Sequence, residues 1–85
     1  MENTLEIQEK VKQFIVKTSY VPEDQINNDS LIFVQGIMDS MGFISIIDFI
    51  EEYFSISAAD NELIETNFES INAITNYISR KIQSN

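Results

Sequence analysis

Apolar residues recur at helical spacing near the start of the chain. Over about residues 4–18 one face carries a stripe of apolar side chains and one threonine, whereas most other positions are polar or charged. The stripe consists of Ile7, Val11, Phe14, Ile15 and Thr18. Asn3 and Glu6 have the spacing of a capping box, with Asn in place of the usual Ser or Thr. Because the stripe follows the helical period, the pattern predicts an amphipathic helix that begins just after Asn3.

A polar connection, SYVPEDQINNDS, follows this first helix. Pro22 lacks a backbone donor, and the cluster of Asn and Asp at residues 27–29 favours turns, so a continuous helix is interrupted here. Three apolar residues in and beside the connection, Val21, Ile26 and Leu31, are expected to pack into the core. The sequence therefore predicts a long first loop with a few buried anchors.

The run FISIIDFI is the most hydrophobic part of the chain, and its residue types suit a strand as well as a helix. Periodicity decides between the two, because alternation would place Asp48 on the same face as Ile46 and Ile50. A helical wheel instead separates an apolar arc from a polar one. The apolar arc is Phe43, Ile46, Ile47, Ile50, Tyr53 and Phe54, and the polar arc is Ser45, Asp48, Glu51 and Glu52. A helix over residues 40–54 is therefore predicted.

Two apolar residues of this second helix fall outside its core arc. Met41 and Ile44 lie among the acidic residues, and Ser40 is at the edge of the same face, one turn from Ile44. Single exposed apolar residues are common on proteins and usually have no special role. Here, however, they give an apolar centre with a charged rim, which is the composition of a surface that binds a partner.

The last part of the chain predicts a short helical turn that buries Phe68 and a longer helix over about residues 71–82. Ser70 is a candidate N-cap of the longer helix. Its apolar stripe consists of Ile71, Ile74, Ile78 and Ile82. Three main helices, one short helix and a long first loop together predict an all-α fold, a small four-helix bundle formed by a single domain over residues 1–85.

Composition excludes several classes of function. The 85 residues include no histidine and no cysteine, which removes the usual general base, thiolate metal ligands and disulfides. Neither a phosphate-binding loop nor an EF-hand loop is present, so an enzyme is disfavoured. The N-terminal residues lack the apolar core of a signal peptide, and no apolar run is long enough to cross a membrane. A cytoplasmic protein without membrane contact is expected.

Charge is distributed unevenly along the chain, whose net charge is −9. The basic residues lie near its two ends, at Lys10, Lys12, Lys17, Arg80 and Lys81. Between them, from residue 19 to residue 79, there are eleven acidic residues and no basic one. Such a surface repels nucleic acid, whose binding needs clustered Lys and Arg. It serves either solubility or the attraction of a basic partner, and charge alone does not decide between them.

The stretch GIMDSMGFISIIDFIEEYFSI resembles the acyl and peptidyl carrier proteins. The signature of that family is a glycine followed by Asp-Ser-Leu or Asp-Ser-Met at the start of the second helix, and Gly36 and residues 39–41 match it. The family's second-helix pattern also ends in a phenylalanine, here Phe54, fourteen residues after the serine. Further along, ETNFESINAITNYI is similar to the family's passage from the third helix to the fourth. The resemblance covers essentially the whole chain.

The resemblance implies that a phosphopantetheinyl transferase attaches 4′-phosphopantetheine from coenzyme A covalently to Ser40. It implies a non-catalytic chain, expected to be a monomer, that carries an acyl, aminoacyl or polyketide intermediate as a thioester for an adenylating ligase or a synthase. The helix start suits a phosphodiester, and Asp39 can serve as N-cap while the Ser40 hydroxyl stays free. The surface expected to bind partners consists of Asp39, Met41, Ile44, Asp48, Glu51 and Glu52.

Three positions depart from the family pattern. Members that serve fatty acid synthesis usually have acidic residues two and five positions after the serine, where this chain has Gly42 and Ser45. Asp48 stands where those members often have an apolar contact residue. The departures argue against general fatty acid synthesis and favour similarity to stand-alone carriers that work beside adenylating ligases. The alternative is an acidic helical module that binds a basic partner while Ser40 stays unmodified.

Overall fold

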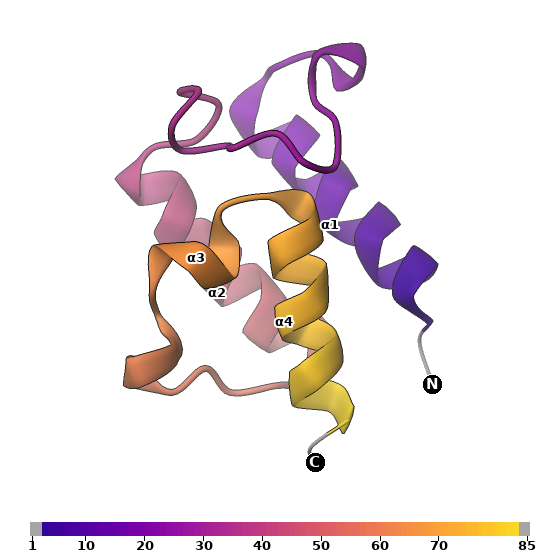
Figure 1. The fold of residues 1–85 in the computed structure, drawn as a ribbon, viewed down its shortest axis with the longest axis vertical. Helices are drawn as coiled ribbons and strands as arrows, with labels where there is room; N and C mark the ends of the chain where they lie inside the picture. The colour runs from indigo at the N-terminus through magenta and orange to yellow at the C-terminus, as the bar shows by residue number, and fades with distance from the viewer. Residues whose placement is uncertain (1–2, 84–85) are drawn as a thin grey trace.

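The computed structural model describes residues 3–83, and this part of the chain consists of helices and loops (Figure 1). The helices are α1 (Thr4–Ser19), α2 (Ser40–Phe54), α3 (Glu65–Phe68) and α4 (Ile71–Gln83), and two 3₁₀ turns, η1 (Glu23–Gln25) and η2 (Asp60–Glu62), lie in the connections. The structure confirms the predicted all-α fold, with three main helices, one short helix and a long first loop.

Short-range contacts explain where the main helices begin and end. Asn3 caps α1, because its Oδ1 accepts a hydrogen bond from the backbone N–H of Glu6 at 2.9 Å. The helix stops at Ser19 because Tyr20 adopts a left-handed conformation, with φ 62°, and its N–H binds the carbonyl oxygen of Val16 at 3.2 Å. Ser55 ends α2 in the same conformation, with φ 56°.

The centre of the fold is α4, which packs closely against both α1 and α3 (Figure 1). The predicted stripe of α4 is confirmed, since Ile71, Ile74 and Ile78 are fully buried and Ile82 packs at the edge of the core. The facing side of α1 contributes Ile7, Val11 and Ile15 to the same cluster. Ser70 lies before α4 as predicted, and its Oγ accepts a hydrogen bond from the N–H of Ala73 at 3.1 Å.

Aromatic rings link α2 to the rest of the bundle. Phe43 meets Phe68 of α3 edge to face at 5.5 Å between ring centroids, and Phe49 stacks on Phe14 of α1 at 4.3 Å. Between them, Ile46 and Ile50 point into the core and are fully buried. Large side chains therefore fill the space around α2, which approaches α1 less closely than α4 does.

Two expectations about the core are wrong. Leu31 is 40% exposed, and its neighbour Ile32 is the buried residue, at 0%. Backbone hydrogen bonds fix Ile32 inward, because its N–H binds the carbonyl oxygen of Glu69 at 2.9 Å and its own carbonyl accepts from Met38 at 2.9 Å. The other anchors of the loop behave as expected: Ile26 is buried and Val21 packs against the core.

Tyr53 is the second exception, because the helical wheel predicts it on the core arc of α2 but its side chain is 47% exposed. Its ring stacks on Phe49 at 5.4 Å, and the ammonium of Lys10 lies 6.0 Å from the ring centroid. The wheel alone cannot show that Phe49, which stacks on Phe14 of α1, occupies the space beneath Tyr53. Tyr53 therefore covers the edge of the core without entering it.

The burial difference between two isoleucines of α2 gives a prediction about stability. Ile50 is fully buried, so Ile50→Ala should leave a cavity and lower the free energy of unfolding by about 2–5 kcal/mol. Ile44 is exposed, and Ile44→Ala should change that free energy by only about 0.5 kcal/mol. Both variants can be measured in one urea denaturation series. An equal loss in the two variants would show that Ile44 belongs to the core.

Candidate functional site

The start of α2 is capped by the residue immediately before it. Asp39 has an extended backbone, and its Oδ1 accepts a hydrogen bond from the N–H of Gly42 at 2.9 Å. Its carbonyl oxygen also accepts from the N–H of Phe43 at 3.0 Å. Two backbone donors of the first turn are therefore satisfied by Asp39. Ser40, the first residue of α2, is exposed, and its hydroxyl is not the capping group.

A tight turn in the long loop delivers Asp39 to this position. Gly36 has φ 76°, in the left-handed region that glycine adopts without steric cost. Its N–H binds the carbonyl oxygen of Phe33 at 3.2 Å, and the N–H of Met38 binds that of Ile32 at 2.9 Å. Because Ile32 is anchored in the core, these bonds fix the segment that leads into α2.

Gly42 allows Met38 to pack against the first turn of α2. Gly42 is buried, and a Cβ atom at this position would lie 2.9 Å from Cε and 3.2 Å from Cβ of Met38. Met38 itself is a core residue. A larger side chain at residue 42 would therefore require Met38 to move.

Two hollows flank the start of α2. The larger has a volume of about 610 Å³ and lies between the long loop, α2 and the start of α3. Its lining is mainly apolar and consists of Phe33, Gly36, Met38, Asp39, Ser40, Phe43, Leu63 and Glu65. The smaller, of about 340 Å³, lies between the end of α1 and the first turns of α2 and includes Thr18, Ser19, Met41 and Ser45. Ser40 lines the larger hollow.

The predicted partner surface divides into an exposed face and an internal anchor. Met41 is 69% and Ile44 is 53% exposed, and Asp48 and Glu52 continue the same face of α2 at intervals of three or four residues. Asp39 is exposed at the end of this face. Glu51 differs, because it is half-buried and its Oε2 accepts a hydrogen bond from the N–H of Ala58 at 2.9 Å. Glu51 therefore ties the end of α2 to the following loop.

Sequence reasoning did not find the walls of the larger hollow. Phe33 and Leu63 come from loops, and Glu65 begins α3. Loops carry no hydrophobic period, so the sequence gives no direct signal that these residues meet Ser40. Phe33 reaches the hollow through its ring contact with Phe43. The packing of α3 beside α2, through the contact between Phe43 and Phe68, brings Leu63 and Glu65 there.

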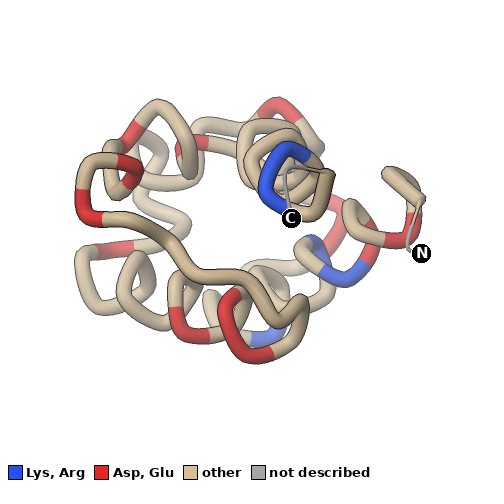
Figure 2. The backbone as a smooth tube through the Cα atoms, turned by 90° about the horizontal axis from the view of Figure 1, so that it is seen from below, with Lys and Arg blue, Asp and Glu red and all other residues tan. Residues whose placement is uncertain are grey.

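The charge distribution around the site follows the sequence. Figure 2 shows the basic residues on α1, beside acidic ones, and near the end of α4, whereas the loops, α2 and α3 carry acidic residues without basic ones. Within residues 3–83 no group of three or more His, Cys, Asp or Glu side chains could hold a metal ion. None of the helices in this range is both long and apolar enough to cross a membrane. The acidic surface formed by the loops, α2 and α3 is electrostatically complementary to a positively charged group or protein surface.

Comparison with known families shows to which family the chain belongs. A family model described as the phosphopantetheine attachment site matches residues 9–78, which is most of the chain. No curated protein matches the chain. Domains of this family are generally non-catalytic carriers that hold 4′-phosphopantetheine covalently on a serine. The chain belongs to the phosphopantetheine-binding family of carrier proteins.

Proposed function

We propose that this single-domain chain carries an acyl, aminoacyl or polyketide intermediate as a thioester on 4′-phosphopantetheine attached to Ser40. The observation that carries the proposal is the arrangement at the start of α2: Asp39 caps the helix, so the hydroxyl of the exposed Ser40 is not needed as the cap and is left for modification. When bound, the group supplies a terminal thiol that forms the thioester. The chain provides attachment and presentation, and partner enzymes provide the chemistry.

The attachment step needs a base from another protein. Ser40 Oγ forms a new bond to phosphorus of the diphosphate of coenzyme A, and the bond from that phosphorus to the adenosine-containing half breaks. That half leaves as adenosine 3′,5′-bisphosphate, and the hydroxyl proton passes to a base of the phosphopantetheinyl transferase. The chain contains no histidine or cysteine, and Asp39, the nearest carboxylate in sequence, is occupied as the helix cap. Its own residues therefore position the hydroxyl without activating it.

The residues around Ser40 fit a phosphodiester and the arm attached to it. Gly42 and Phe43 donate to Asp39, so the first two amides of α2 are those that a helix start leaves for other acceptors. The positive end of the helix dipole lies at the same place and stabilises a negative charge. The larger hollow beside Ser40 offers the arm and its cargo a mainly apolar wall.

The exposed face of α2 supports a role in partner binding. Met41 and Ile44 form an apolar centre next to Ser40, and Asp48 and Glu52 form an acidic rim. A phosphopantetheinyl transferase and an adenylating ligase or synthase with an apolar patch ringed by Lys or Arg would match this face. Gly42 and Ser45 remove two acidic positions used by carriers of general fatty acid synthesis, so we favour a dedicated ligase in a specialised pathway.

Replacing Ser40 tests the attachment site. Ser40→Ala should gain no mass when it is incubated with coenzyme A and a broad-specificity phosphopantetheinyl transferase, whereas the wild type should gain one phosphopantetheinyl group. Ser45→Ala is the matched control, because Ser45 lies on the same helix outside the attachment motif, and it should be modified like the wild type. Intact mass spectrometry reads all three proteins. An unmodified wild type would favour the alternative, an acidic helical module that binds a basic partner with Ser40 free.

Truncating Ile44 tests the docking face. Ile44→Ala should weaken binding to the transferase by more than about 1 kcal/mol, a several-fold loss of affinity, because it removes an apolar anchor beside Ser40. Leu5→Ala is the matched control, since Leu5 is also an exposed aliphatic residue and lies on α1, away from this face. Affinities can be measured by titration calorimetry with Ser40→Ala as the common background, which prevents turnover. Equal affinities of the two variants would place the docking face elsewhere.

A further inference from the structure

The connection between α2 and α3, residues 55–64, has few anchors in the core. Of its apolar side chains only Ile56 is buried, while Ala58 and Leu63 are half-buried and Ile64 is exposed. Leu63 nevertheless forms part of the wall of the larger hollow, as does Glu65 directly after the connection. The width of the hollow beside Ser40 therefore depends on contacts other than core packing that hold this connection in place.

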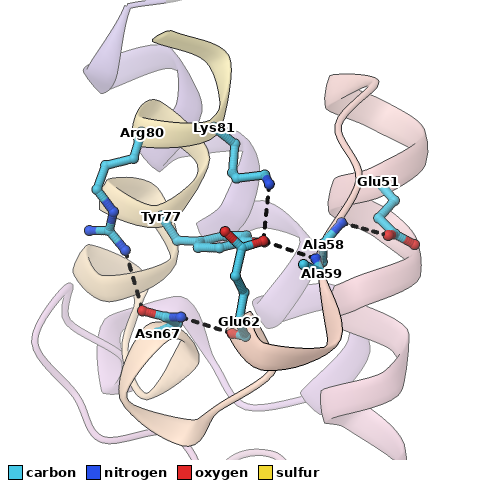
Figure 3. A network of polar contacts seen from close by, with 8 residues as sticks. All are labelled: Glu51, Ala58, Ala59, Glu62, Asn67, Tyr77, Arg80 and Lys81. Atoms are coloured by element: carbon cyan, nitrogen blue, oxygen red, sulfur yellow. Dashed lines mark hydrogen bonds and ion pairs between the residues drawn. The ribbon is translucent and has the colours of Figure 1, made fainter. Parts of the chain in front are cut away.

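One carboxylate oxygen supplies much of that support (Figure 3). Glu62 Oε1 accepts hydrogen bonds from the N–H of Ala59 at 2.9 Å, the hydroxyl of Tyr77 at 3.1 Å and the ammonium of Lys81 at 3.0 Å. Tyr77 and Lys81 lie one turn apart on α4, and Ala59 precedes the 3₁₀ turn η2. The same oxygen thus binds the backbone at the start of η2 and attaches η2 to the central helix, α4.

Further bonds from the backbone and from α2 complete the attachment. The carbonyl oxygen of Glu62 accepts a hydrogen bond from Nδ2 of Asn67 in α3 at 2.8 Å, and Arg80 donates to Oδ1 of the same Asn67 at 3.3 Å. At the other end of the connection, Glu51 of α2 holds the N–H of Ala58. Figure 3 shows Glu62 at the centre of this network, facing α4. Glu62 therefore takes part in two of these attachments, through its side chain to α4 and through its backbone to α3, whereas the bond between Glu51 and Ala58 is separate.

The protonation states around Glu62 suit this arrangement. The hydrogen bond from the N–H of Ala59, and then that from Lys81, hold the pKa of Glu62 below its usual value, so it is charged at neutral pH. Burial, followed by the nearby Glu62 carboxylate, raises the pKa of Tyr77 to about 12, so its hydroxyl remains a donor. Glu51 raises the pKa of Tyr77 slightly further, whereas Arg80 acts in the opposite direction.

We propose that Glu62 is a latch that holds the connection between α2 and α3 against α4 and so positions Leu63, which forms part of the wall of the hollow beside Ser40. The role of that hollow in holding cargo rests on the function proposed above, but the latch itself does not. Loss of the carboxylate charge releases the connection, because the ion pair between Glu62 and Lys81 is lost and Ala59 and Tyr77 keep a weaker acceptor. The hollow then widens at Leu63 while the packed core of α1 and α4 is retained.

Hydrogen exchange of the unmodified Ser40→Ala protein tests the latch without any cofactor. In Glu62→Gln the amides of Ala59 and Leu63, which close η2, should exchange roughly five- to tenfold faster, and the methyl resonances of Leu63 should shift. Asp60→Asn is the matched control, because it removes the same charge from the same turn, and it should exchange like the parent protein. Equal exchange in Glu62→Gln and Asp60→Asn would overturn the proposal.

The pH profile separates the latch from a general loss of structure. Because the pKa of Glu62 is lowered in the folded protein, its contribution is complete above about 4.5, the unfolded value, and is lost as pH falls through the folded pKa. Protection of Leu63 should therefore fall at acidic pH in the parent and show no such step in Glu62→Gln. Tyr77→Phe, which keeps the buried ring, should give a smaller acceleration at neutral pH. An acid step that persists in Glu62→Gln would also overturn the proposal.

Discussion

The capping of α2 by Asp39 is the constraint on which the functional geometry depends. A helix start exposes backbone donors that must find acceptors, and serine is among the residues that commonly provide one. In this chain the aspartate directly before the serine does so, with a 2.9 Å bond to Gly42. Ser40 is therefore held on the first turn of a helix as an exposed residue beside the larger hollow. In the proposed function, the hydrogen bond that Asp39 makes one residue earlier leaves Ser40 available for attachment.

The rest of the fold keeps that first turn in place. The Gly36 turn and the anchor at Ile32 lead the loop into Asp39, and Met38 fits against Gly42. On the far side, ring contacts fix α2 to α1 and α3, and α3 brings the wall of the hollow toward Ser40. Glu62 then ties the connection between these helices to α4. Core packing and polar contacts thus both hold the first turn of α2 and the hollow beside Ser40 in place.

Features that depend on residues close together in the sequence could be predicted, whereas those that depend on contacts between distant segments could not. Periodicity and capping residues predicted the bounds of α2, the role of Asp39 as a cap and the exposure of Met41 and Ile44, because each depends on neighbours within one or two turns. That Ile32 is buried and Leu31 is not depends on the hydrogen bond from the N–H of Ile32 to the carbonyl oxygen of Glu69, which is distant in the sequence. The internal bond of Glu51, the exposure of Tyr53 and the network of Glu62 likewise arise between separate elements, where a single helical wheel carries no information.

The most direct test of the account is to locate the prosthetic group on the wild-type protein. After co-expression with a broad-specificity phosphopantetheinyl transferase, proteolysis and fragmentation mass spectrometry assign the modified residue. The account predicts that the phosphopantetheinyl group is found on Ser40 and on no other hydroxyl. A group on a different serine, or an unmodified protein under conditions in which the transferase modifies a control carrier, would contradict it.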